Sequence, residues 1–208
     1  MFIDLTLPID TDIPVFPGDP QPKINQISTI AENGWNEKQL VITSHFATHI
    51  EAPIHMVENG KTLSDYPIES FIGEAIVFDV RGQSIIDVNV DDVKANDIVF
   101  FQTDHIRHVY ESTYFENNPV LSKEIIEKLI DKEISIVGID SFTPDNEPFS
   151  LHKRLFHHDI RIVENLTHLD QIPTRRFFCY IFPLYIKEAD GAPCRVVAQV
   201  KDRTMDVA

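Results

Sequence analysis

Runs of apolar residues separated by short polar breaks follow one another along most of the chain, and this pattern predicts more strands than helices. We expect strands over residues 38–44, 75–80, 97–103, 134–139, 160–163 and 177–186. Several runs, such as 134–139, are almost continuously apolar, which is typical of strands covered on both faces. The clearest helix runs over 122–132, where Ser122 can cap the N-terminus and apolar residues recur at helical spacing. The predicted fold class is therefore α/β, with a mixed β-sheet core and few helices.

The chain carries no sign of a boundary between domains. No low-complexity or linker segment divides it, and no repeat of about 20 to 50 residues is present. Residues 13–22, IPVFPGDPQP, concentrate four prolines in ten positions and predict a rigid loop. We expect a single domain over residues 1–208, long enough to bury a sizeable core without disulfides.

Charge and cysteine content exclude several classes of partner and compartment. The chain has 33 acidic against 18 basic residues, a net charge of −15, which argues against nucleic acid and anionic membranes as partners. Two cysteines do not make a disulfide framework and favour a reducing compartment. The start, MFIDLTLPID, lacks the basic and apolar regions of a secretory signal. We expect a soluble cytoplasmic protein whose partner is a small molecule.

The segment HFATHIEAPIH, residues 45–55, is the strongest chemical signal, because it places three histidines and a glutamate within eleven residues. Imidazole and carboxylate are ligands for zinc, manganese and iron. In an extended strand His45 and His49 would lie about 13 Å apart, at roughly 3.3 Å per residue, so the chain must turn there if both bind one ion. From His49 to Glu51 an extended stretch places both side chains on one side. Pro53 prevents the turn from continuing as a helix.

A second cluster lies about a hundred residues later along the chain. His152, His157 and His158 precede a short predicted strand, and Glu164 follows it. Neighbouring residues point apart, so at most one of His157 and His158 can face a site. Spacing alone leaves open which members of this cluster join the first one.

The 45–55 segment resembles the motif His-x-Gly-Thr-His-x-Asp-x-Pro-x-His of the cyclase family of metal-dependent hydrolases, which includes bacterial kynurenine formamidase and isatin hydrolase. All three histidines, Thr48 and Pro53 are in register, while Ala47 stands in place of the glycine and Glu51 in place of the aspartate. The resemblance extends over nearly the whole chain, through IDLTLPI, PVFPGDP, VGIDSFTPD and ADGAPCRVVA.

The resemblance implies a site and an assembly. It implies a swivelling β/β/α-like architecture, one or two divalent ions per chain, zinc first and manganese second, and a homodimer or homotetramer. His45, His49 and Glu51 would hold the first ion, and Glu51 would bridge to a second. His152 and Glu164, twelve positions apart as in the family, would complete the ligand set, which is His45, His49, Glu51, His152 and Glu164.

Two further residues take their expected roles from the same resemblance. His55 matches the family's general acid/base, and Phe16, in the Pro-Val-Phe-Pro-Gly-Asp turn, matches the aromatic residue that lines the substrate pocket. The sequence departs from the family motif at two positions, Ala47 and Glu51, and each has an expected structural consequence. Glu51 has an arm one methylene longer than aspartate, and Ala47 adds a Cβ, which is tolerated where the backbone needs neither positive φ nor close approach.

The implied activity is hydrolysis of an amide by metal-activated water, either an N-formyl aryl amide such as N-formylkynurenine or a cyclic amide. Two alternatives stay open. The chain could be a related lactone hydrolase or a dehydratase or cyclase, because the same hydroxide serves several electrophiles. It could also be a catalytically silent metal-binding protein, an alternative raised by Glu51.

Overall fold

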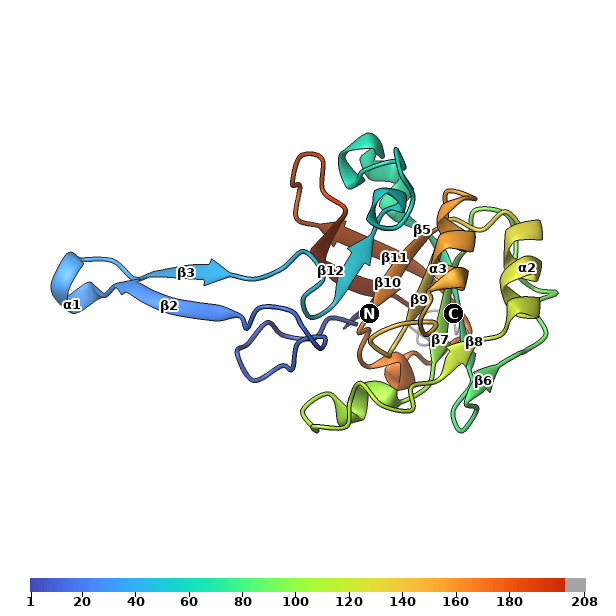
Figure 1. The fold of residues 1–208 in the computed structure, drawn as a ribbon, viewed down its shortest axis with the longest axis horizontal. Coiled ribbons are helices and arrows are strands. Elements are labelled where there is room, and N and C mark those ends of the chain that lie inside the picture. The colour runs from blue at the N-terminus through green and yellow to red at the C-terminus, as the bar shows by residue number, and fades with distance from the viewer. Residues whose placement is uncertain (201–208) are drawn as a thin grey trace, which may run out of the picture.

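A mixed β-sheet forms the centre of the molecule in the computed structural model, which describes residues 1–200 (Figure 1). The strands are β1 (Phe2–Asp4), β2 (Lys23–Ser28), β3 (Glu37–Val41), β4 (His49–Glu51), β5 (Ile72–Asp79), β6 (Ile85–Ile86), β7 (Ile98–Gln102), β8 (Val120–Leu121), β9 (Ile136–Ile139), β10 (Arg161–Glu164), β11 (Arg176–Pro183) and β12 (Gly191–Gln199). The α-helices are α1 (Ile30–Asn33), α2 (Lys123–Asp131) and α3 (Ser150–Phe156).

Eight strands form the main sheet in the order β1-β12-β11-β5-β7-β9-β10-β4. Strands β5, β7, β9 and β10 are parallel, and the remaining neighbours are antiparallel. The first residues of β12 also pair with β4, so the sheet closes into a ring. The predicted α/β class with a mixed sheet and few helices is confirmed.

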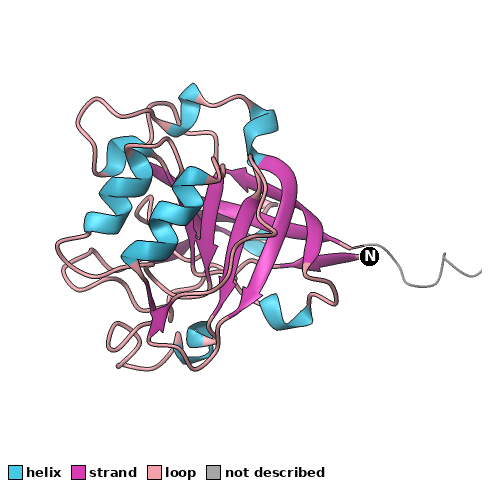
Figure 2. Ribbon diagram, turned by 90° about the vertical axis from the view of Figure 1, so that its right-hand side faces the viewer, coloured by secondary structure: helices cyan, strands magenta, loops and turns pink. Residues whose placement is uncertain are grey.

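The sheet is covered on both faces, as its apolar runs predict. In β7, Ile98 and Phe100 belong to the core inside the ring, whereas Val99 and Phe101 pack in the layer beneath α2 and α3. Both helices lie on the same side of the sheet (Figure 2). Gly138 in β9 leaves room for the inward-facing Phe100, because a Cβ there would lie 2.5 Å from the phenylalanine ring. Close packing of this kind makes the ring a dense interior.

The predicted helix over 122–132 is confirmed by α2. Ser122 Oγ accepts a hydrogen bond from the backbone N–H of Ile125, and the apolar side of the helix is buried against the sheet. Helix α3 was not expected, because it has no capping side chain at its N-cap, Phe149, which lies at positive φ. A distant carboxylate replaces the cap, since Asp145 Oδ2 accepts from the Leu151 N–H.

Strands also form where the central apolar runs predict them, at β5, β7, β9, β10 and β11. The strand predicted over 38–44 is shorter than expected and lies outside the main sheet. The observed strand, β3, ends at Val41 and, within residues 1–200, pairs with β2 alone. The two strands and α1 form a hairpin, residues 23–41, that projects from the body of the molecule (Figure 1). We call this hairpin the arm.

The arm exposes apolar side chains along its length: Ile27, Ile30, Trp35, Leu40 and Val41. Every residue of β3 is exposed. Among residues 1–200, no helix is both long and apolar enough to span a membrane.

Candidate metal centre

The histidine-rich segment turns between His45 and His49, as the ligand geometry requires. Residues 44–48 form turns and bends, and the two imidazole rings come to lie 5.1 Å apart. Thr48 anchors the turn, because its hydroxyl donates to the carbonyl of Asn165 and accepts from the N–H of Leu7. Strand β4 follows at once and places His49 and Glu51 on one side, as expected.

Ala47 occupies the left-handed region, at φ 56°. The backbone at Ala47 therefore has the positive φ that favours glycine. This conformation costs a residue with a Cβ about 1–2 kcal/mol. In this conformation the carbonyl of Ala47 accepts two hydrogen bonds, from His49 Nδ1 at 3.0 Å and from the side chain of Asn165 at 3.1 Å. The family's glycine at this position is explained by the same turn.

One group of candidate ligands consists of His45, His49 and Glu51. Glu51 Oε1 lies 2.9 Å from His45 Nδ1 and 3.4 Å from His49 Nε2. His49 and Glu51 are almost completely buried. One donor atom from each residue lies within 4.8 Å of the others, which is close enough to share one ion.

A second group consists of Glu51, His152 and Glu164. His152 Nε2 lies 3.5 Å from Glu51 Oε2 and 3.3 Å from Glu164 Oε1. His152 comes from α3 and Glu164 from the end of β10, the neighbour of β4 in the sheet. Glu51 thus belongs to both groups, with one carboxylate oxygen facing each.

The buried polar atoms of the site fit a divalent ion. His49 Nε2 and Glu51 Oε2 are buried and make no hydrogen bond, although buried polar atoms nearly always find a partner. In His49 and His152 the ring nitrogen that points away from the carboxylates of the ligand groups makes a hydrogen bond. His49 Nδ1 donates to the Ala47 carbonyl, and His152 Nδ1 donates to Asp145 Oδ1. Such outer partners leave the lone pair of the inner nitrogen for a metal.

His55 lies beside these groups rather than inside them. It ends the short 3-10 helix Pro53–His55, and its Nε2 is 3.9 Å from Glu51 Oε1. Its ring packs 4.1 Å from that of His45. Burial lowers the pKa of His55, and this effect outweighs the raising influence of Glu51. The residue is therefore neutral near pH 7.

The carboxylates hold protons on the ligand histidines while no ion is bound. Burial alone would lower the pKa of His49, but the negative charges of Glu164 and Glu51, 3.3 Å and 3.4 Å from its Nε2, raise the pKa to about 10. The pKa of His152 is raised well above its usual value for similar reasons, with Asp145 as the strongest raising partner. An ion must displace these protons, so metal binding depends on pH.

The groups lie at the base of a cavity of about 320 Å³. Its aromatic wall includes Phe16, which is 42% exposed and contacts the rings of Phe115 and Phe142. Tyr114 lies behind this wall and donates a hydrogen bond to the side chain of Asn165. The cavity therefore combines an apolar mouth with a polar base, as small-molecule sites do.

All of the predicted site residues line this cavity: Phe16, His45, His49, Glu51, His55, His152 and Glu164. Of the second sequence cluster, His157 and His158 are exposed at the end of α3. Sequence reasoning missed Asp145 and Asp190. Both lie in the segments that carry the family resemblance, but nothing in their spacing marked them as contacts of the histidines.

Comparisons with known proteins identify the family of the chain. The sequence profile of the family described as "Putative cyclase" matches residues 3–146. The chain is 30% identical to the kynurenine formamidase of Bacillus mycoides, over 94% of this chain and 96% of that protein. It is 28% identical to the kynurenine formamidase of Erythrobacter litoralis, over 93% and 91% of the two chains.

Solved structures are similar over nearly the whole chain. A potential metal-dependent hydrolase with cyclase activity superposes with a TM-score of 0.82 at 30% identity, covering 95% of this chain and 96% of that one. Isatin hydrolase A from Labrenzia aggregata shares the fold, with a TM-score of 0.86 at 23% identity and coverage of 97% and 94%. The chain therefore belongs to the cyclase family.

Proposed function

We propose that this protein is a metal-dependent hydrolase that cleaves an amide bond, acting on an N-formyl aryl amide such as N-formylkynurenine or on a cyclic amide. One observation carries the proposal: the Glu51 carboxylate joins two groups of candidate metal ligands in a cavity with an aromatic wall. The names of the relatives, kynurenine formamidase and metal-dependent hydrolase, agree with this chemistry.

Two divalent ions per chain fit the ligand groups, with zinc as the first choice and manganese as the second. His45, His49 and Glu51 would hold one ion, and Glu51, His152 and Glu164 the other. Bound there, the metal supplies Lewis-acid polarisation of the scissile carbonyl and a water of lowered pKa.

His55 supplies the proton transfer. Its neutral ring accepts a proton at Nε2 from the attacking water and then donates that proton to the departing amine nitrogen. As the C–N bond breaks, the water oxygen stays on the acyl carbon, and the carboxylic acid so formed ionises by releasing the second proton of the water to solvent. The lowered pKa of His55 keeps the accepting form populated at neutral pH. The position of the ring beside Glu51, at 3.9 Å, suits this task.

The aromatic wall supports a planar aryl substrate. Phe16 meets Phe115 edge to face, with ring centroids 5.8 Å apart, and both residues line the cavity. Aromatic groups prefer such offset or edge contacts. A cavity of about 320 Å³ is at the lower end of the range for small-molecule sites, roughly 300–1,000 Å³, which favours a single small ring with a short side chain.

A substrate panel tests the reaction class. The metal-loaded protein would be offered N-formylkynurenine, isatin and an aryl lactone, and kcat/KM would be measured for each. We expect cleavage of an amide, with the lactone slower. Faster turnover of the lactone would move the assignment to a lactone hydrolase, and bound metal without turnover of any of them would indicate a silent metal-binding protein.

We also propose that residues 1–208 form one domain.

We further propose that two or more copies assemble through the arm. A two-stranded hairpin is at best marginally stable alone. The arm nevertheless exposes apolar residues on two strands that, within residues 1–200, pair only with each other. Residues 23–41 carry two lysines and two glutamates, so the arm can approach a second acidic copy without adding to the repulsion.

Light scattering on a sizing column tests the assembly. Ile30 in the arm and Ile85 in β6 are both 65% exposed, which makes them a matched pair. We expect Ile30→Lys to lower the molar mass and Ile85→Lys to leave it unchanged. A wild-type protein that elutes as a monomer of 23.8 kDa would refute the proposal.

The cytoplasm is the location we propose. Cys179 and Cys194 are both free and buried, which suits a reducing compartment. Cell fractionation with detection of the protein in the cytosolic fraction tests this, and recovery outside that fraction would contradict it.

A further inference from the structure

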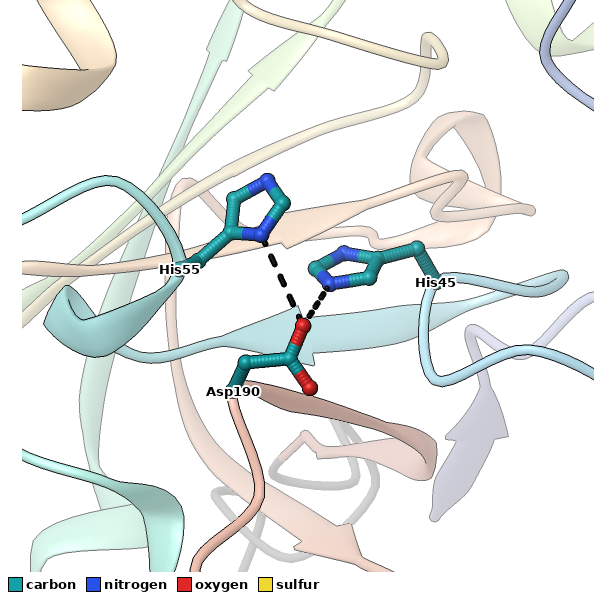
Figure 3. Close-up of side chains that lie close together, drawn as sticks. All are labelled: His45, His55 and Asp190. Carbon is teal, nitrogen blue, oxygen red and sulfur yellow. Dashed lines mark hydrogen bonds and ion pairs between the residues drawn. The ribbon is translucent and has the colours of Figure 1, made fainter. Parts of the chain in front are cut away.

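Asp190 places a carboxylate between His45 and His55, outside the expected ligand set (Figure 3). Its Oδ2 lies 2.8 Å from His45 Nε2 and 3.6 Å from His55 Nδ1. The opposite nitrogens of both rings face Glu51, with His45 Nδ1 at 2.9 Å and His55 Nε2 at 3.9 Å from its Oε1. One oxygen atom therefore approaches the outer nitrogen of both histidines.

An ionised carboxylate can only accept hydrogen bonds, so the ring nitrogen that faces it carries the hydrogen. His45 Nε2 hydrogen-bonds Asp190 at 2.8 Å, so Nδ1, which faces Glu51 at 2.9 Å, is the nitrogen that an ion held by Glu51 and His49 would use. For His55 the Asp190 oxygen is 3.6 Å from Nδ1, beyond hydrogen-bond distance, but its negative charge favours the hydrogen on Nδ1 and the lone pair on Nε2, the nitrogen nearer to Glu51. The same carboxylate thus orients a ligand histidine by a hydrogen bond and the histidine beside it by its charge.

The other ligand histidines have outer partners of their own. His49 Nδ1 donates to the Ala47 carbonyl, and His152 Nδ1 donates to Asp145. Each of those partners contacts one imidazole ring. Asp190 differs because it lies close to two rings, and one of these, His55, is not in the expected ligand set.

The fold holds Asp190 in place although its side chain is 43% exposed. Its backbone carbonyl accepts from the N–H of Ala52 at 2.8 Å, next to Glu51. The following residue, Gly191, pairs with Glu51 in the sheet. The carboxylate is therefore attached to the same strand pair that carries the ligands.

We propose that Asp190 is a positioning residue that fixes the ring orientation and tautomer of both His45 and His55, and so couples metal ligation to proton transfer. The part that concerns His55 rests on the proposed function, whereas the part that concerns His45 does not. A competing possibility is that Asp190 binds an ion itself, because donor atoms of His45, His55 and Asp190 lie within 4.8 Å of one another.

Zinc affinity and stoichiometry separate these possibilities without any substrate. Competition against a chromophoric chelator would be measured for wild type, Asp190→Asn and Glu188→Gln. Glu188 lies two residues away, and among residues 1–200 the single ion pair of its carboxylate is with Lys187, so Glu188→Gln controls for the loss of one charge.

We expect Asp190→Asn to bind zinc about 10–100-fold more weakly at unchanged stoichiometry, as outer-partner variants do, and Glu188→Gln to match wild type. Unchanged affinity in Asp190→Asn would overturn the proposal. Loss of one whole equivalent, with the remaining zinc bound as tightly as before, would also overturn it and make Asp190 a ligand.

A double-mutant cycle tests the link to His55 on metal-saturated protein with N-formylkynurenine. We expect Asp190→Asn to lower kcat about 10–100-fold with KM within about twofold, and to cause no further loss in the His55→Ala background. The same loss in both backgrounds would overturn the role toward His55. If wild type cleaves no amide, the proposed function fails, and the zinc measurement still decides the role toward His45.

Discussion

Gly191 is the position at which one added methyl group should damage the metal centre most selectively. A Cβ at Gly191 would lie 2.9 Å from His45 Cε1 and 3.1 Å from the carbonyl oxygen of Ile50. Ile50 is completely buried in β4, between β10 and β12, so its backbone cannot retreat. The imidazole of His45 must move instead.

The required movement is large on the scale of the site. An ordinary contact begins near 3.4 Å, so the ring must shift by about 0.5 Å. His45 is held at both ends, 2.9 Å from Glu51 and 2.8 Å from Asp190, and the shift lengthens or misaligns at least one of these contacts. Disturbing a ligand's orientation costs about 10–100-fold in metal affinity, which corresponds to roughly 1.4–2.8 kcal/mol.

The assay is zinc affinity of Gly191→Ala by chelator competition, with the thermal midpoint of the metal-free protein as a check on folding. Gly73→Ala is the matched control, because a Cβ there would meet only Ile98 Cδ1, at 3.9 Å. We expect weaker zinc binding in Gly191→Ala alone. If a folded Gly191→Ala protein binds zinc as tightly as wild type, the contacts with Glu51 and Asp190 do not hold His45 in the position that zinc binding requires, and the argument is refuted.

Further variants and conditions test other parts of the account. His55→Ala should lower kcat/KM by 10²–10⁴, about 3–5 kcal/mol, at unchanged metal content, whereas His49→Ala should lose metal; equal metal loss in both would contradict the assigned roles. The raised pKa of His49, about 10 against 6.5, stabilises the metal-free fold below pH 6.5, and this contribution is lost as pH rises through 10. Calorimetry from pH 6 to 10 should show that decline without zinc, and a flat profile would argue against it. Ala47→Val puts a β-branched residue at positive φ and should cost at least about 2 kcal/mol in denaturant unfolding, whereas Ala47→Gly should stay within about 1 kcal/mol of wild type. Gly138→Ala should cost about 1–3 kcal/mol by overpacking the ring, and an unchanged unfolding midpoint would show that the core has room.

The central strands and α2 could be predicted because local pattern and final environment agree. In 134–139 the apolar run matches a strand buried on both faces, and Ser122 caps the helix that its neighbours predict. The metal segment could be predicted for a similar reason. The turn after His45 and the extended step from His49 to Glu51 follow from the ligand geometry itself.

The remaining features depend on contacts that spacing does not encode. Helix α3 is started by Asp145 rather than by a residue at its own N-cap. Asp190 reaches His45 across 145 residues, because β12 pairs with β4. The positive φ of Ala47 follows from the turn, and alanine itself gives no local signal for it.

The metal content of wild type and Glu51→Ala, measured by elemental analysis together with cleavage of N-formylkynurenine, tests the central claim most directly. Glu51 belongs to both ligand groups, so the account predicts two equivalents of metal and formamide cleavage in wild type. In the variant it predicts the loss of bound metal and of cleavage. Wild-type metal content in Glu51→Ala, or no metal in wild type after reloading, would contradict it.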